Sequence, residues 1–237
     1  MSNVQLSNQI DCSNLSSEEI NYNVKDLIFN NYKHIVLKNV HGKKGLLEGL
    51  KGNIKIEIIG DVDSLFANSI DGAKIIVNGN IGDNSAGGVK SGKFTLFGSS
   101  GNYFGNNVDS GEFYILENCG RNSFSKLTNL SKVVIGGYPG INFGESSKGG
   151  RIIILNLKGG NFFIDNETKF FENSRIDSIY VRGNIKINNN KFLIENIIEE
   201  DEDIYLPLIS EFARLFSYSL SEIKSKPFYR IVFSDKR

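Results

Sequence analysis

The chain has few of the residue types from which metal sites and disulfide frameworks are built. Its 237 residues include two cysteines and two histidines. Cys12 and Cys119 lie too far apart in the sequence for a zinc or iron–sulfur ligand set, and two thiols do not make a disulfide framework. His34 and His41 lack the spacing of a metal-ligand pair on one helix turn. We therefore expect free thiols and no resident metal.

Net charge and long apolar runs are also missing. Lysine and arginine number 27, as do aspartate and glutamate, so no net field attracts nucleic acid or an anionic membrane. No apolar run approaches the roughly 20 residues of a membrane-spanning helix, and residues 1–14 lack the basic start and apolar core of a signal peptide. The sequence predicts a cytoplasmic protein with neither nucleic-acid nor membrane partners.

The strongest pattern in the sequence is a repeat with a period of about 19 residues, which is typical of solenoid proteins. Units at 74–92, 93–111 and 112–130 follow one another, and a unit at 55–73 precedes them. One extra residue near Ser131 restores the register of the units that come next. In a solenoid, each turn of chain stacks on the one before.

Stacking the units produces three wholly apolar columns. Apolar positions two residues apart indicate a strand with one buried face. The first column holds Ile56, Ile75, Phe94, Phe113, Val133 and Ile152, the second Ile58, Val77, Leu96, Ile115, Ile135 and Ile154, and the third Ile70, Val89, Val108 and Leu127. The third column closes the opposite wall of a buried core.

Glycine marks the expected corners. One column contains Gly60, Gly79, Gly98 and Gly137, and another Gly82, Gly101, Gly120, Gly140 and Gly159. Because glycine adopts positive φ at little cost, each column predicts a corner repeated on every rung. About six or seven rungs, about 4.8 Å apart, would make a prism roughly 30 Å tall. Since parallel crossovers are overwhelmingly right-handed, the predicted fold class is all-β: a right-handed parallel β-helix with short N-terminal and C-terminal capping helices.

Two other repeat folds fit less well. A leucine-rich repeat needs a leucine and asparagine ladder and a period of about 20 to 29 residues. A calcium-binding β-roll uses paired nonapeptides, about 18 residues per turn, and only Asp61, Asp63 and Asp83 fall near usable positions. Both are weaker hypotheses than the β-helix.

The N-terminal segment, residues 1–33, has a helical pattern. Ser16 and Glu19 have capping-box spacing, and apolar residues follow on one helical face. Residues 34–42 then have the pattern of the first strand of the stack.

The β-helix is expected over residues 34–190, where 178–186 repeats the rung pattern after a looped stretch. The remaining segment, residues 191–237, begins with an acidic run. An amphipathic helix is predicted at 206–226 and a closing strand at 228–233. The helix could cap the open end of the solenoid, or it could dock a partner subunit.

Residues able to carry chemistry are scattered along the chain. Cys119 occupies a coil position typical of a small buried residue, and Cys12 has no basic or histidine neighbour to activate it. The acids Glu200, Asp201 and Asp203 lie where a helix N-terminus favours negative charge, which accounts for them more simply than a metal site. No glycine-rich phosphate loop precedes a helix. The sequence predicts no catalytic, cofactor-binding or metal-binding residue.

The ordered series of rungs resembles the glycine-repeat (GXGXG) domain that forms the C-terminal β-helix of the large glutamate synthase subunit. The resemblance covers nearly the whole chain. Its segments are 10–21 for the opening, 74–92 and 93–111 for the regular rungs, 133–155 for the last regular rungs, and 210–220 with 228–234 for the closing helix and strand.

The resemblance implies a β-helix without chemistry of its own, which holds glutaminase (amidotransferase) and flavin-dependent synthase partners in place. The family's flavin, cluster and nucleophile residues belong to other domains, so none carries over to this chain. A similar domain forms a scaffold subunit of formylmethanofuran dehydrogenase, and another occurs in N-methylglutamate synthase-like complexes, which gives two alternatives.

Another hypothesis is a free-standing β-helix, homo-oligomeric in one version, that binds a small molecule or acts as an enzyme. Its groove would be lined by outward side chains such as Asn80, Asp83, Asn102, Tyr103 and Arg121.

Overall fold

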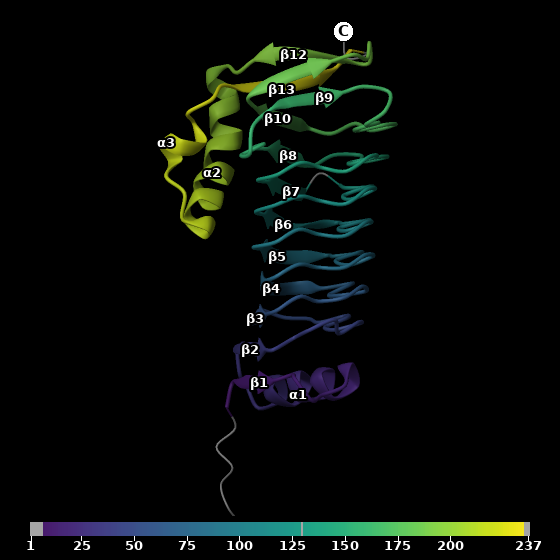
Figure 1. Ribbon diagram of the computed structural model, residues 1–237, viewed down its shortest axis with the longest axis vertical. Coiled ribbons are helices and arrows are strands. Elements are labelled where there is room, and N and C mark those ends of the chain that lie inside the picture. The colour runs from purple at the N-terminus through teal and green to yellow at the C-terminus, as the bar shows by residue number, and fades with distance from the viewer. Residues whose placement is uncertain (1–6, 129, 235–237) are drawn as a thin grey trace, which may run out of the picture.

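The chain folds into a tall stack of parallel rungs (Figure 1). The computed structural model describes residues 7–128 and 130–234. It shows a parallel β-solenoid of about 8 turns, with coils about 20 residues apart and 16% of the residues in helices. The predicted parallel β-solenoid is therefore confirmed, with more turns than the six or seven expected. Residues 1–6, part of the segment searched for a signal peptide, lie outside the described residues.

One 11-stranded sheet forms a wall along the whole stack. Its strands, in spatial order, are β1 (Gln9–Asp11), β2 (His34–Lys38), β3 (Lys55–Ile59), β4 (Asp71–Asn78), β5 (Ser91–Leu96), β6 (Ser110–Ile115), β7 (Leu130–Ile135), β8 (Arg151–Ile154), β10 (Ser178–Arg182), β13 (Phe228–Phe233) and β12 (Phe192–Asn196). The strands from β1 to β10 are parallel, whereas β13 and β12 pair antiparallel. The strands predicted at 34–42, 178–186 and 228–233 are therefore present.

The register of the sheet follows the sequence repeat. Lys93 pairs with Glu112, and Glu112 pairs with Lys132, a step that is longer by one. The extra residue predicted near Ser131 is thus confirmed. The last step of the stack is longer still, because β9 (Asn161–Ile164) lies in the stretch expected to be a loop, where it pairs with β11 (Asn184–Ile187).

The three apolar columns line the interior as predicted, and every member is buried. A fourth column was not predicted: aromatic rings are stacked edge to face along the wall opposite the sheet. Ring centroids are 5.5 Å apart for Phe104 and Phe124, 5.7 Å for Phe124 and Phe143, and 6.1 Å for Phe143 and Phe171. Edge-to-face contact at these separations is a favoured aromatic geometry, so the column stabilises the stacking of the rungs.

The two glycine columns have a different cause from the one predicted. Of their nine glycines, only Gly60 and Gly159 have positive φ. A Cβ on Gly120 would lie 2.5 Å from the carbonyl carbon of Gly101, and one on Gly140 would lie 2.6 Å from the backbone nitrogen of Arg121. The expectation of positive φ is wrong for seven of the nine. Glycine is required there because the backbones of successive rungs touch.

Positive φ is found at other glycines, which the sequence pattern did not single out. Gly72, Gly92 and Gly111 have φ of 93°, 122° and 130°. They lie near the start of β4, β5 and β6, where the register between β4 and β5 shifts. These glycines therefore form the corner that leads into the sheet.

Different elements close the two ends of the stack (Figure 1). At the N-terminal end, α1 (Ser17–Phe29) has the predicted capping box and packs its buried face on the core through Ile20, Val24 and Leu27. At the C-terminal end, β13 and β12 form an antiparallel pair over the last rung.

The C-terminal helix does not lie over the open end, which was one of its two expected positions. α2 (Glu199–Phe216) runs along the side of the upper rungs (Figure 1). Ser217, with φ of 59°, ends it, and the short α3 (Leu220–Ile223) follows, so the helix predicted at 206–226 is two helices. The α2 side chains Tyr205, Leu208, Ile209, Phe212 and Phe216 form one cluster with the outward residues Tyr114, Val134, Ile153 and Tyr180 of the sheet.

Two buried polar groups fix these helices to the sheet. Asp201, 2% exposed, accepts hydrogen bonds from Tyr180 Oη at 2.8 Å and from the backbone N–H of Ile198 at 3.1 Å. The buried guanidinium of Arg182 donates to the carbonyl oxygens of Leu155 at 3.2 Å and Ile223 at 2.6 Å. Each group thus joins the wall to a helix that comes later in the chain. Among the residues described, no helix combines the length and apolarity needed to cross a membrane.

Candidate functional site

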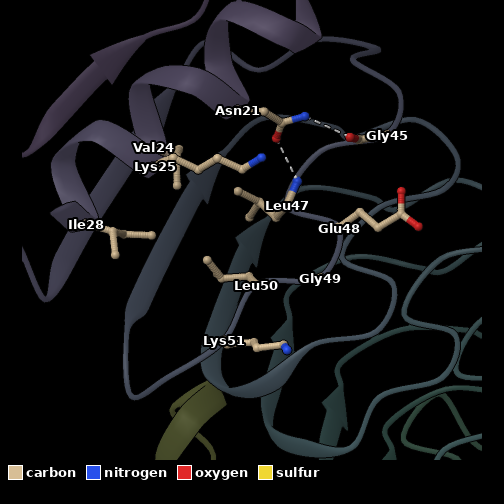
Figure 2. Close-up of a pocket in the computed structure, with 10 residues that line it drawn as sticks. All are labelled: Asn21, Val24, Lys25, Ile28, Gly45, Leu47, Glu48, Gly49, Leu50 and Lys51. Atoms are coloured by element: carbon tan, nitrogen blue, oxygen red, sulfur yellow. Dashed lines mark hydrogen bonds between the residues drawn. The ribbon is translucent and has the colours of Figure 1, made fainter.

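A groove of about 630 Å³ lies between α1 and the turn at residues 45–51 of the first rung (Figure 2). Val24 and Ile28 come from α1, and Leu47 and Leu50 come from the turn. Figure 2 shows these four side chains on facing sides of the groove. The groove exists because α1 packs on the core through one side only. The part of that side next to the turn forms one side of the groove.

Asn21 fixes the turn relative to the helix. Its Nδ2 donates to the carbonyl oxygen of Gly45 at 3.0 Å, and its Oδ1 accepts from the backbone N–H of Leu47 at 2.9 Å. Both bonds are drawn in Figure 2. Leu47 has a φ of 62°, a strained value for a leucine. Because the side-chain amide satisfies both backbone groups, the turn can hold that conformation and the groove has a defined shape.

The chemistry of the groove is that of binding. Lys25, Glu48 and Lys51 are exposed at its rim, and its walls are aliphatic. The ten lining residues include no cysteine, histidine, serine, threonine or tyrosine. The arrangement can therefore hold an apolar group beside charged ones, and Glu48 is the one carboxylate in its lining.

The two cysteines predicted to be free thiols are free and buried. Burial raises the pKa of Cys12 to about 11 and that of Cys119 to about 12. Both therefore remain protonated thiols at neutral pH, which is the unreactive form. His34 lies on β2 with its Nε2 3.6 Å from Glu57 Oε2, and His41 is exposed in the segment that follows.

The acids considered for calcium are used to join rungs or turns. Asp61 Oδ1 accepts from the backbone N–H of Asn80 at 2.6 Å, and Asp83 Oδ1 accepts from that of Asn102 at 2.7 Å. Asp63 caps the neighbouring backbone N–H of Ser64 at 2.6 Å. Across residues 7–128 and 130–234, no group of three acid, histidine or cysteine side chains is placed to hold a metal ion.

The acids at the start of α2 differ in their surroundings. Asp201 is buried in the contact with Tyr180 described above, and Arg230 Nη1 lies 3.4 Å from its Oδ1. Glu200 and Asp203 are exposed to solvent. This arrangement matches the expectation of helix N-terminal acids.

Three of the five outward side chains proposed for a ligand groove, those of Asn80, Asp83 and Asn102, form ladders between rungs. Asn80 Oδ1 accepts from the backbone N–H of Ser99 at 2.9 Å, and Asn102 Oδ1 accepts from that of Arg121 at 3.0 Å. Each amide thus completes the hydrogen bonding of the rung above, as an asparagine ladder does in other stacked strands. Tyr103 is exposed, and it does not border any of the grooves described in this structure.

No protein-family model, no curated protein and no solved structure matches this chain. The groove was also not predicted from the sequence. Its two sides come from a helix and a turn that belong to different patterns, and the only local sign is the pair of glycines, Gly45 and Gly49, around the leucines of the turn.

Proposed function

We propose that this chain is a non-catalytic scaffold subunit of a glutamate synthase-like oxidoreductase, in which it positions amidotransferase and flavin-dependent synthase partners. The observation that carries the proposal is the way the rungs are joined. Polar side chains at the corners bond the next rung, and the glycine columns let the backbones touch. In a stack joined in this manner the polar side chains at these corners are already partnered by the next rung, which suits a spacer between enzymes.

The resemblance of the rung series to the glycine-repeat domain supplies the kind of partner. The buried, protonated thiols and the binding character of the groove agree with a chain that leaves the chemistry to other subunits. Formylmethanofuran dehydrogenase and N-methylglutamate synthase-like complexes are the alternatives within the same class, because similar domains occur in both.

We assign the groove of Figure 2 as a docking position for a partner subunit. An apolar side chain of the partner would lie on the half-buried Leu50, and an acidic neighbour would face Lys25 or Lys51 at the rim. Aliphatic anchors in a pocket surrounded by polar residues are the usual pattern of a binding hot spot.

The test is affinity purification of the tagged chain from its native cells, with the co-eluting chains identified by mass spectrometry. The proposal predicts amidotransferase and flavin-dependent synthase chains. Leu50→Glu places a charge in the groove and should reduce their recovery at least tenfold, about 1.4 kcal/mol in affinity. Leu130→Glu, at an exposed position on β7, controls for the added charge and should not change recovery, and an unchanged circular dichroism spectrum of Leu50→Glu verifies that this variant is folded. Recovery that is equal for both variants would remove the groove from the proposal.

A small-molecule-binding β-helix is the second candidate, because the groove volume falls within the roughly 300–1,000 Å³ of ligand pockets. Native mass spectrometry of the purified chain separates the two. A bound mass that is lost in Leu50→Glu, without partner chains, favours the small molecule.

A further inference from the structure

The last strand of the sheet has one unpaired edge. β12 pairs with β13 through register Phe192↔Phe233 to Asn196↔Tyr229, and it pairs with no other strand of the described chain. It is the uppermost strand in Figure 1, beyond which no element lies. A row of backbone N–H and C=O groups is therefore directed away from the molecule.

The register shows which residues carry these free groups. The carbonyl oxygen of Lys191 accepts a hydrogen bond from the backbone N–H of Ser234 at 2.9 Å. Hydrogen-bonding positions alternate along an antiparallel strand, so Leu193 and Glu195 bond β13 in the same way. Phe192, Ile194 and Asn196 consequently direct their backbone groups to the open edge.

The edge lacks the strongest of the features that normally prevent pairing, and its one charged residue is Glu195. Natural edge strands are protected by proline, by lysine or by a bulge. Residues 192–196 contain neither proline nor lysine, and their pairing with β13 is continuous. Leu193 and Ile194 are 37% and 42% exposed. At the other end of the stack, β1 has only three residues and adjoins α1.

We propose that a second copy of this chain pairs with this edge, β12 against β12 in antiparallel orientation, with Leu193 of each copy on the two-fold axis. In this register Phe192 of one copy and Ile194 of the other form a hydrogen-bonded pair. Lys191 of one copy then lies opposite Glu195 of the other, on both sides of the axis.

Charge complementarity selects this register over its neighbour. A register centred on Ile194 would also match the free backbone groups, but it would place Leu193 opposite Glu195 and leave Lys191 opposite Ile197. Lys191 already donates to Glu172 at 2.7 Å, and more than half of its side chain is exposed, so a second carboxylate can approach it. Opposite charges that face each other across a strand pair stabilise it, whereas an unpaired charge opposite an apolar residue does not.

The pairing stops at two copies, because the two-fold arrangement occupies the open edge of both. It produces a dimer with the two stacks joined at their C-terminal ends. The groove beside α1 lies at the far end of each stack, so the dimer does not depend on the scaffold function or on that groove.

Cysteine cross-linking tests the register. Leu193 would form a non-hydrogen-bonded pair with itself, with Cα atoms about 4.5 Å apart, within the range of a disulfide. Leu193→Cys should therefore give a disulfide-linked dimer under mild oxidation. Two variants are the controls: Glu195→Cys lies on the same strand, and Tyr22→Cys lies at an exposed position far from this edge. Both should remain mostly monomeric. The native thiols do not compete, because both are buried and protonated.

Sedimentation of the unmodified chain gives a second measurement that needs no cysteine. We expect a concentration-dependent dimer, which Ile194→Pro abolishes by removing one outward N–H while the bonds to β13 remain. An unchanged circular dichroism spectrum verifies that the variant is folded. A monomer at the concentrations used for cross-linking, or equal cross-linking of all three cysteine variants, would overturn the proposal.

Discussion

Gly120→Ala tests the finding that glycine is needed for space between rungs. An added Cβ at this position would lie 2.5 Å from the carbonyl carbon and oxygen of Gly101 and 2.6 Å from the backbone nitrogen of Asn102. All three atoms belong to the backbone of the rung below, which is held by its own ladder of hydrogen bonds. The rungs must therefore separate locally to accept one methyl group.

The size of the effect follows from this geometry. Overpacking typically costs about 1–3 kcal/mol, and the upper end applies where backbone must move. We expect about 3 kcal/mol, which for a chain of this length corresponds to a fall of about 6–12 °C in the unfolding temperature. Gly42→Ala is the matched control. Gly42 has a φ of 60° and no atom near its added Cβ, so only the left-handed backbone is penalised, by about 1 kcal/mol.

Thermal unfolding followed by far-ultraviolet circular dichroism measures both variants under identical conditions. The reasoning predicts that Gly120→Ala unfolds well below Gly42→Ala. If the control variant were destabilised as much or more, positive φ and not contact between rungs would be the main requirement for glycine in this fold.

Three further predictions concern buried and charged groups. Asp201→Ala should lower the free energy of unfolding in urea by about 3 kcal/mol, because it leaves a buried tyrosine hydroxyl and a nearby guanidinium without their partner; a change under about 1 kcal/mol would contradict this. A hydrogen bond from Arg214 lowers the pKa of Glu211 to about 2, so its stabilising effect is complete above about pH 4.5 and is lost as the pH falls towards 2. The stability difference between wild type and Glu211→Gln should therefore shrink over that interval in acid titrations. Cys12 and Cys119 should resist a thiol reagent at pH 8 until the chain is unfolded, whereas fast labelling of the native protein would show that burial does not protect them.

The repeating part of the fold could be predicted because a single feature recurs in it. Ile56, Ile75 and Phe94 occupy one column at equal spacing, and the structure pairs them in neighbouring strands. Even the extra residue near Ser131 was visible, since it shifts every later column by one. Periodicity identifies neighbours in a solenoid, because each rung contacts only the rungs beside it.

The parts without a period could not be predicted in the same way. β9 and β12 lie where no earlier rung supplies a template, and the two strands are recognised only from their pairing. The amphipathic stripe of α2 predicted a buried side but not the surface that covers it. A weak signal did exist: the outward strand position is Glu57, Ile76 and Thr95 in the lower rungs and is large and apolar in every rung from Tyr114 through Val134 to Ile153, the residues that pack in the α2 cluster.

The glycine columns show that a pattern can be identified correctly and still be assigned the wrong physical cause. Glycine serves both positive φ and close backbone approach, and the sequence does not separate the two. Only the position of Gly101 beneath Gly120 distinguishes them. The groove beside α1 was missed for a related reason, because no periodic residue marks a space between a cap and the first rung.

The scaffold function is tested most directly by native mass spectrometry of the chain as it occurs in a fresh cell extract, with flavin absorbance followed in the same fractions. The proposal predicts that the 26.4 kDa chain is found in a larger heteromeric assembly that contains flavin and an amidotransferase subunit. Recovery of the chain only as a monomer or a homodimer, without flavin and without other chains, would contradict it.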